Sequence, residues 1–314
     1  KLILILLGLA VTVFSQTYPT PPEVSPTQYD RYSFTINGER LFLASGEFHY
    51  WRCPSIELWE TTLKRMRANG LNAVSIYFHW GFHSPTRGEY DFSGIRDVER
   101  LLQMCEDIGL YVIARPGPYI NAETDAGGLP DWLLTSNATM RANDPGYLAA
   151  VGEWWDAVVP IIARHQLHKG GNVIMFQIEN ELGDGDPLYM QSLYKMTRDR
   201  GIDVPIFHND SIAWAQYPYS VDVSGHDDYP AWFFCREPWT MKFLADITDE
   251  HEEVYRDSLK QTHIPMFEVE YQGGSIDYWG GPGYQACYDK LGPEFVDASI
   301  KSLIGEGTTA VNQY

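Results

Sequence analysis

Short apolar segments alternate along the chain with longer segments whose apolar residues recur every three or four positions. The short segments predict buried strands, and the longer ones predict amphipathic helices packed on one face. Gly70, Gly109 and Gly201 follow three of the expected helices, where a glycine cap is common. The eight expected strands cover residues 41–45, 73–78, 110–115, 173–178, 204–208, 221–225, 266–270 and 308–313.

Strands alternating with helices predict a parallel sheet, and eight such units predict a closed (β/α)8 TIM barrel of the α/β class. No Gly-x-Gly-x-x-Gly string follows the first expected strand, which argues against a dinucleotide-binding sheet. We expect the barrel over residues 37–314, after an extended leader over residues 17–36. No helix follows the last expected strand, so we expect the barrel to be truncated within its eighth unit.

The first residues have the pattern of a secretory signal peptide, expected over residues 1–16: one Lys, an apolar run over residues 2–14, then Ser15 and Gln16. The run is too short to span a bilayer, and no later segment is long and apolar enough. These features predict a secreted, extracellular protein with no membrane contact; a buried terminal strand is the alternative. Asn137 and Asn209 begin glycosylation sequons, as expected for that route.

The composition limits the possible partners. The formal net charge of −19 disfavours nucleic acid and anionic membranes. Aromatic residues make up 14% of the chain, and their flat faces suit sugar rings, although most are expected to pack in the core. The Cys and His spacings fit no metal-ligand set, so we expect no metal and no cofactor.

Two expected strands, ending near residues 181 and 270, run directly into carboxylates. The carboxyl ends of barrel strands share one face, so these acids are expected to converge on one pocket. Two converging carboxylates are the working groups of most glycosidases.

Side-chain alternation leaves two candidates on each strand, Glu179 or Glu181 and Glu268 or Glu270. The last residue of a barrel strand reaches the open face, which favours Glu181 and Glu270. The earlier acids are then expected to be structural and paired with interior bases such as Arg115.

Several strings in this order resemble glycoside hydrolase family 35, the β-galactosidases, and in particular its secreted fungal branch. They are Ser-Gly-Glu-Phe-His-Tyr at 45–50, Arg-Pro-Gly-Pro-Tyr-Ile at 115–120, Gly-Gly-Leu-Pro at 127–130, the string at 177–183 and Glu-Tyr-Gln-Gly-Gly at 270–274.

The resemblance implies a retaining exo-β-galactosidase acting on β-galactoside oligosaccharides or polysaccharides, with Glu181 as acid/base and Glu270 as nucleophile. It also implies a disulfide between Cys235 and Cys287 and further β-rich domains after the barrel. Alternatively, the barrel cleaves another β-glycone such as a β-glucosaminide, or binds sugar without catalysis. The alternative for Tyr77 is a packing role alone, and the alternative for Glu123 is a solvated side chain. The implied substrate-binding residues are Tyr77, Asn121, Ala122, Glu123, Asn180, Tyr229 and Tyr314.

Overall fold

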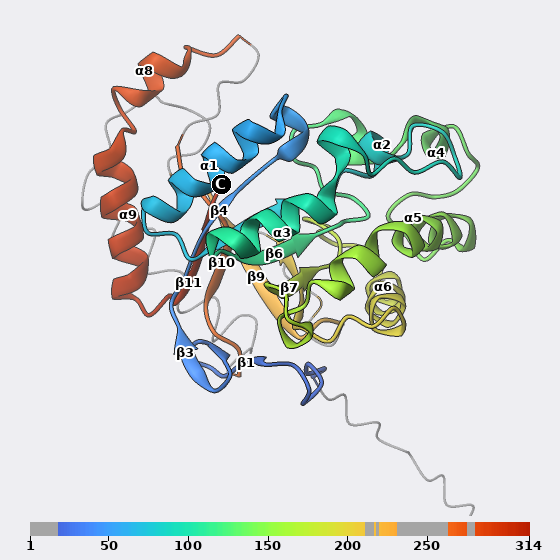
Figure 1. Ribbon diagram of the computed structural model, residues 1–314, viewed down its shortest axis with the longest axis horizontal. Coiled ribbons are helices and arrows are strands. Elements are labelled where there is room, and N and C mark those ends of the chain that lie inside the picture. Colours follow the sequence, from blue (N-terminus) through green and yellow to red (C-terminus); the bar gives the residue numbers. More distant parts are fainter. Residues whose placement is uncertain (1–17, 211–216, 218–219, 231–262, 275–279) are drawn as a thin grey trace, which may run out of the picture.

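The chain folds into a barrel of parallel strands surrounded by helices (Figure 1). The computed structural model describes residues 18–210, 217, 220–230, 263–274 and 280–314. Eight strands form a closed barrel in the order β10-β11-β4-β5-β6-β7-β8-β9, which confirms the predicted TIM barrel. The strands are β4 (Leu43–Glu47), β5 (Ala73–Tyr77), β6 (Tyr111–Arg115), β7 (Val173–Gln177), β8 (Ile206–Asp210), β9 (Val223–Asp228), β10 (Phe267–Tyr271) and β11 (Ala310–Gln313).

The helices begin and end where the sequence supplies capping groups. Asp97, Asp144 and Asp186 each accept a backbone N–H bond at a helix start, and Gly109 ends α3 in the left-handed conformation. The described α-helices are α1 (Ile56–Ala68), α2 (Trp80–His83), α3 (Val98–Ile108), α4 (Asp131–Leu134), α5 (Pro145–Arg164), α6 (Pro187–Asp199), α8 (Tyr284–Tyr288) and α9 (Pro293–Gly305). The short 3₁₀ helices are η1 (Tyr50–Arg52), η2 (Gly94–Arg96), η3 (Asp125–Gly128) and η4 (Leu167–Lys169).

Every expected strand is present, but four of them begin two residues later than expected. The strands expected at 41–45, 204–208, 221–225 and 308–313 are β4, β8, β9 and β11. Val204 and Val221 are buried before their strands begin, in the segments that enter the barrel. Apolar residues therefore mark burial, whereas the hydrogen-bonded ladder starts only where a neighbouring strand lies alongside.

A small antiparallel sheet lies where an extended leader was expected. It contains β1 (Thr27–Tyr29), β2 (Phe34–Ile36) and β3 (Glu39–Leu41). Asn37 and Gly38 both have positive φ, as a two-residue hairpin turn requires. Phe34 contacts Phe267 edge to face at the amino end of β10, so this sheet packs against the bottom of the barrel. Strands of three residues carry too little alternation for their sequence to predict them.

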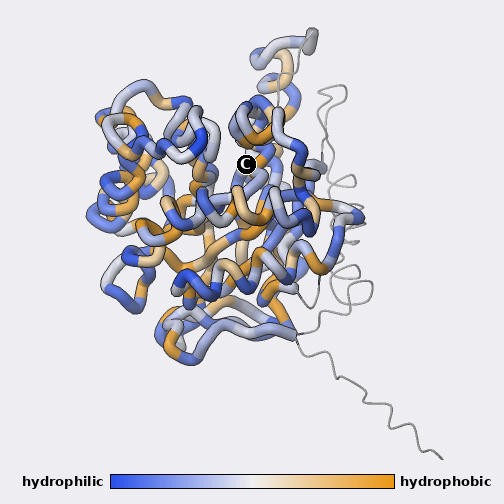
Figure 2. Tube along the Cα trace, turned by 90° about the vertical axis from the view of Figure 1, so that its right-hand side faces the viewer, coloured by the Kyte–Doolittle hydropathy of each residue, from blue (hydrophilic) through white to orange (hydrophobic). Residues whose placement is uncertain are grey.

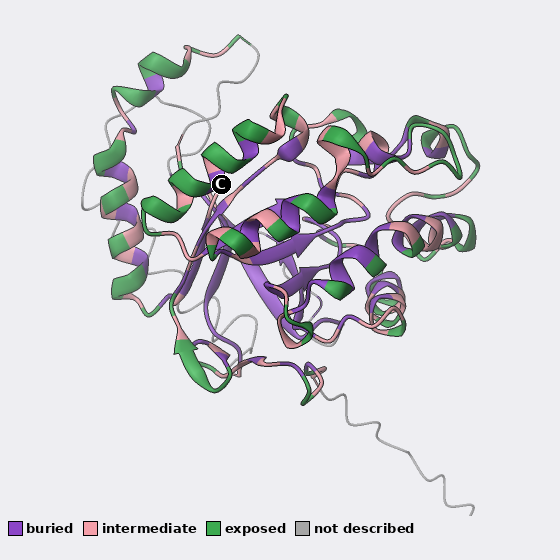
Figure 3. Cartoon of the chain, in the orientation of Figure 1, coloured by how far each residue is buried: buried purple, intermediate pink, exposed green. Residues whose placement is uncertain are grey.

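The hydrophobic core has two layers. One fills the space between the strands and the surrounding helices, and includes Val74 and Ile76 of β5 with Trp155 and Val158 of α5. The other fills the inside of the barrel toward its amino end. Figures 2 and 3 show that the central strands are hydrophobic and buried, and that the helices around them expose their outer faces. Within the described residues, none of the helices combines the length and apolarity needed to cross a membrane.

Candidate active site

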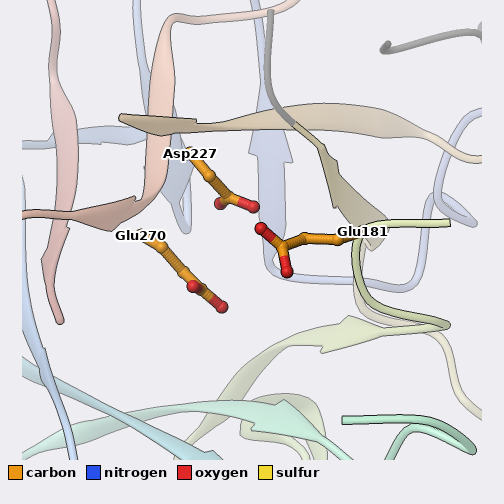
Figure 4. Close-up of side chains that lie close together, drawn as sticks. All are labelled: Glu181, Asp227 and Glu270. Carbon is orange, nitrogen blue, oxygen red and sulfur yellow. The ribbon is translucent and has the colours of Figure 1, made fainter. Parts of the chain in front are cut away.

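Three carboxylates meet at the carboxyl ends of the strands (Figure 4). Glu270 lies on β10, Asp227 on the adjacent β9, and Glu181 just after β7. One oxygen atom from each lies within 4.8 Å of the others. The two acids that the sequence predicted to converge therefore do share one pocket.

Glu270 is buried and surrounded by hydrogen-bond donors. The hydroxyl of Tyr77 lies 2.7 Å from Glu270 Oε1, and the Arg115 guanidinium donates to the same oxygen at 2.6 Å. Asn209 Nδ2 lies 3.3 Å from Oε1, and the hydroxyl of Tyr229 donates to Oε2 at 2.7 Å. The negative charge of this carboxylate is thus balanced by a cation and by neutral donors on both oxygens.

Glu181 has a contrasting environment. Its carboxyl has one long hydrogen bond, 3.5 Å from Asn180 Nδ2. Burial, followed by the negative charges of Glu270 and Asp210, raises the pKa of Glu181 to about 7. One acid therefore sits among donors, while burial and nearby negative charges favour the protonated form of the other below about pH 7, an arrangement that suits two carboxyl groups to different tasks.

The earlier acids pair with basic side chains, as expected, but the partners differ from the prediction. Glu179 pairs with Arg141 at 2.7 Å, and Glu268 lies 2.8 Å from His226 Nδ1. Arg115 was the expected partner, and this expectation is wrong. Its guanidinium faces the pocket side of the barrel, where it pairs with Glu47 at 2.9 Å and with Glu270.

The alternation expected after β7 also fails. The strand ends at Gln177, and both Glu179 (φ 62°) and Glu181 (φ 44°) adopt the left-handed conformation. Glu181 therefore reaches the pocket from a turn and not from a regular strand position.

The residues that the family resemblance implies for sugar binding lie near the same three carboxylates. Asn180 Oδ1 lies 2.5 Å from the Tyr77 hydroxyl and 3.1 Å from Arg115 Nη2. The hydroxyl of Tyr314 donates to Glu123 Oε2 at 2.9 Å, and its ring lies 6.4 Å from that of Tyr229. Tyr77 thus does more than pack.

The loop after β6 carries three further implied residues in one unusual backbone run. Asn121, Ala122 and Glu123 have φ values of 48°, 51° and 47°. Ala122 is buried, whereas Glu123 is exposed apart from its contact with Tyr314. Arg52 Nη2 donates to the carbonyls of Ala122 and Glu123 and fixes this run beside the pocket.

Asp227 is a member of the cluster that the sequence did not single out. Its Oδ2 accepts a bond from Asn209 Nδ2 at 2.6 Å, and its Oδ1 is buried without a hydrogen-bond partner among the described residues. Burial, then Glu270, then Glu181 raise the pKa of Asp227 well above the usual range, which favours its neutral form. The expected sixth strand ended at residue 225, which placed Asp227 in a loop.

The two sequons differ in exposure. Asn209 is buried on β8 and its amide nitrogen donates to Asp227, so a glycan at Asn209 is incompatible with this fold and that prediction is wrong. Asn137 is exposed, and its glycosylation stays a prediction.

The four cysteines form two groups. Cys53 and Cys105 are free thiols. Cys287 is buried in α8, but Cys235 lies outside the described residues, so a disulfide between them stays a prediction.

The carboxylate cluster is suited to proton transfer more than to metal binding. Glu181, Asp227 and Glu270 have a spacing that a cation can use. However, Arg115 already supplies a positive charge to Glu270 at 2.6 Å, and Ca²⁺ or Mg²⁺ would require six or more oxygen ligands. The set of contacts fits one carboxylate held by hydrogen-bond donors beside one acid that can give up a proton.

Comparisons with known proteins agree with this geometry. Residues 33–314 match the model of glycosyl hydrolases family 35. The chain is 38% identical over 314 residues to "Probable beta-galactosidase B" of Talaromyces marneffei, and 38% identical over 298 residues to "Probable beta-galactosidase A" of Aspergillus phoenicis. Each match covers 91% of this chain but only 31% and 29% of the relative, so the chain spans less than a third of the length of these relatives.

Solved structures share the barrel. The β-galactosidase from Rahnella sp. R3 matches with a TM-score of 0.67 at 13% identity, covering 94% of this chain and 52% of that one. A family 5 mannosidase from Rhizomucor miehei matches with a TM-score of 0.64 at 13% identity, covering 94% and 85%. At such low identity the likeness shows the fold alone.

Proposed function

Because the chain belongs to glycosyl hydrolases family 35, we propose that it removes terminal β-D-galactose from oligosaccharides or polysaccharides with retained configuration. The main support is the unequal acid pair: Glu181 and Glu270 have oxygens within 4.8 Å of each other, in opposite electrostatic environments. Retaining enzymes hold their two carboxyl groups about 5–5.5 Å apart, so that one can bond to the sugar.

The proposed reaction has two steps. First, Glu270 attacks the anomeric carbon while Glu181 gives its proton to the departing glycosidic oxygen, so a glycosyl ester forms as the glycosidic bond breaks. The negative charge of Glu270 is then lost, which removes one of the causes that raise the pKa of Glu181. Glu181 can therefore accept a proton from water, which attacks the ester and releases galactose.

The surrounding residues have roles consistent with their positions. Asn180, beside Glu181, would bind the 2-hydroxyl of the sugar, a contact that strengthens in the transition state. Tyr77 and Tyr229 orient Glu270 from its two oxygens. Glu123, held by Tyr314, would accept bonds from paired hydroxyls, next to Asn121 and Ala122.

Covalent trapping tests this function. A 2-deoxy-2-fluoro-β-D-galactosyl fluoride slows the second step more than the first, so the full-length enzyme should gain the mass of one fluorogalactosyl group. Peptide mass spectrometry should locate this group on Glu270. Turnover of galactosides without any trapped ester, or an ester on another residue, would rule out the proposed roles.

The same assays separate the alternative functions. An enzyme for another glycone should hydrolyse nitrophenyl β-glucosaminide faster than nitrophenyl β-galactoside. A sugar-binding barrel should bind galactose without hydrolysing either compound, and should not be labelled. The presence of both acids, with one protonated and one balanced by Arg115, favours catalysis.

We also propose that the protein is secreted, with residues 1–16 removed and Asn137 glycosylated. The exposure of Asn137 supports this. A secreted sample whose mass falls after glycosidase F treatment, with conversion of Asn137 to Asp, would agree. Retention of residues 1–16 in the mature protein would contradict it.

The pH dependence of the reaction should report the protonation of Glu181. Because its pKa is raised to about 7, its acid form is present below pH 7 and is lost above it. For substrates with poor leaving groups, kcat/KM should therefore fall tenfold per pH unit above about pH 7. The Glu181→Gln variant, assayed with the same substrates, should have a low kcat/KM that lacks this basic limb; an identical limb in both proteins would assign it to another group.

A further inference from the structure

Glu181 is carried by a strained turn. Glu179 and Glu181 both have positive φ although neither is glycine, a conformation that crowds the Cβ atom against the backbone and is unfavourable for such residues. Such a turn persists only where its surroundings enforce it. The groups that enforce it also determine where the Glu181 carboxyl points.

Arg141 contacts three consecutive residues of this turn. Its Nη2 donates to the Glu179 carboxylate at 2.7 Å, to the Asn180 carbonyl at 2.6 Å and to the Glu181 carbonyl at 3.0 Å. Its Nε lies 3.2 Å from the other oxygen of Glu179. A single guanidinium thus binds the whole turn, and only a planar group with several donors can do this.

Glu179 forms the other half of the arrangement. Its carboxylate, only 1% exposed, also accepts bonds from the Asn180 backbone N–H at 2.8 Å and from the Tyr189 hydroxyl at 2.9 Å. Arg141 is itself held by Tyr119: the guanidinium carbon of Arg141 lies over the Tyr119 ring, 3.8 Å from its centre. Gly127 leaves room for that ring, because a Cβ atom at Gly127 would lie 1.9 Å from it.

We propose that Arg141 is a positioning residue for proton donation, fixing the turn that aims Glu181 at the departing oxygen. This proposal rests on the proposed glycosidase function. Within the described residues, the hydrogen bonds of Arg141 go to Glu179 and to carbonyl groups of the turn, and none goes to Glu270. Its loss should therefore impair proton transfer to the leaving group far more than attack by the nucleophile.

Leaving-group dependence distinguishes this role from a general structural one. A dinitrophenyl group departs without a proton, whereas phenyl and alkyl groups require one. In the full-length Arg141→Lys variant, kcat/KM should fall about 100-fold for phenyl and alkyl β-galactosides, but less than about threefold for the dinitrophenyl compound. A plot of log kcat/KM against leaving-group pKa should become steeper, toward that of Glu181→Gln.

Two further variants serve as controls for effects on protein stability. Arg141→Met combined with Glu179→Gln leaves no unpaired buried charge, so it should unfold close to the wild-type temperature and still show the steeper plot. Arg164→Lys changes an arginine of a half-exposed ion pair with Glu99 and should leave the plot unchanged.

The outcomes separate the two proposals. An equal loss for all leaving groups in a folded variant whose Glu270 still becomes labelled would overturn the positioning role alone. The wild-type slope in the double variant would overturn it as well. A wild-type protein that hydrolyses no galactoside and is not labelled would instead overturn the proposed function.

Discussion

Replacing Glu270 with glutamine should lower kcat/KM for every aryl β-galactoside by on the order of 10⁵-fold, because an amide cannot form the glycosyl ester. Glutamine keeps the shape of the side chain and one oxygen that can accept bonds from Arg115 and Tyr77. Arg115 also keeps its pair with Glu47, so the fold should survive the loss of one buried ion pair. Steady-state kinetics alongside thermal unfolding should show a large loss of activity in a protein that still folds cooperatively, with a lowered Tm.

Glu268→Gln is the matched control for this experiment. It lies two residues earlier on the same strand, is fully buried and contacts His226 instead of the pocket. Its kcat/KM should fall less than about tenfold, although its stability should also fall because the buried hydrogen bond between Glu268 and His226 is weakened. Similar losses of activity at positions 268 and 270 would mean that Glu270 acts through the fold and not as a nucleophile.

Replacing Arg115 with methionine should have the largest effect on stability. The Arg115 side chain has no exposed surface and pairs with both Glu47 and Glu270, so its removal leaves two buried carboxylates without a cation. Breaking a buried pair from one side costs about 3–5 kcal/mol. Urea unfolding should show this loss at neutral pH, and activity should fall as well because Glu270 loses a hydrogen-bond donor.

The pH dependence of this loss follows from Glu47. Burial alone would raise the pKa of Glu47, but Arg115 and then His49 lower it from 4.5 to about 2. A carboxyl group with a lowered pKa stabilises the fold above pH 4.5, and this stabilisation is lost as the pH falls toward 2. The deficit of Arg115→Met should therefore shrink as the pH is lowered below about 4.5.

Two companion variants make the result specific to the buried pair. Arg115→Met with Glu47→Gln should regain part of the lost stability, since one unpaired charge is removed. Arg164→Met should cost less than about 1 kcal/mol, because its ion pair is half exposed. Equal losses in the Arg115 single and double variants would show that the charge of Glu47 is not the cause.

The sequence predicts the barrel well because its signal is local. Each strand is a short apolar run bounded by turn residues, and helix ends such as Gly109 have the residue that their conformation requires. The convergence of Glu181 and Glu270 also follows from the sequence, since parallel strands present their carboxyl ends to one face.

The parts that were not predicted depend on contacts between distant residues. The turn through Glu179 and Glu181 departs from strand alternation because Arg141, from the loop before α5, binds it. Asp227 enters the cluster because β9 extends to Asp228, alongside β10. Arg115 pairs with acids on β4 and β10, which are separated from it by 68 and 155 residues. Local periodicity contains no information on such pairings.

The closure of the barrel by β11 affects the order in which the molecule forms. β11 pairs with β10 on one side and with β4 on the other, and Asn312 bonds to both Ser45 and Glu47. At 5–20 residues per second, a ribosome adds the residues of β11 roughly 10–50 s after β4. Until then two strand edges stay open to mispairing. The pocket can therefore form only once β11 has been made, and the nascent chain should be inactive and dependent on chaperones until synthesis has passed this strand.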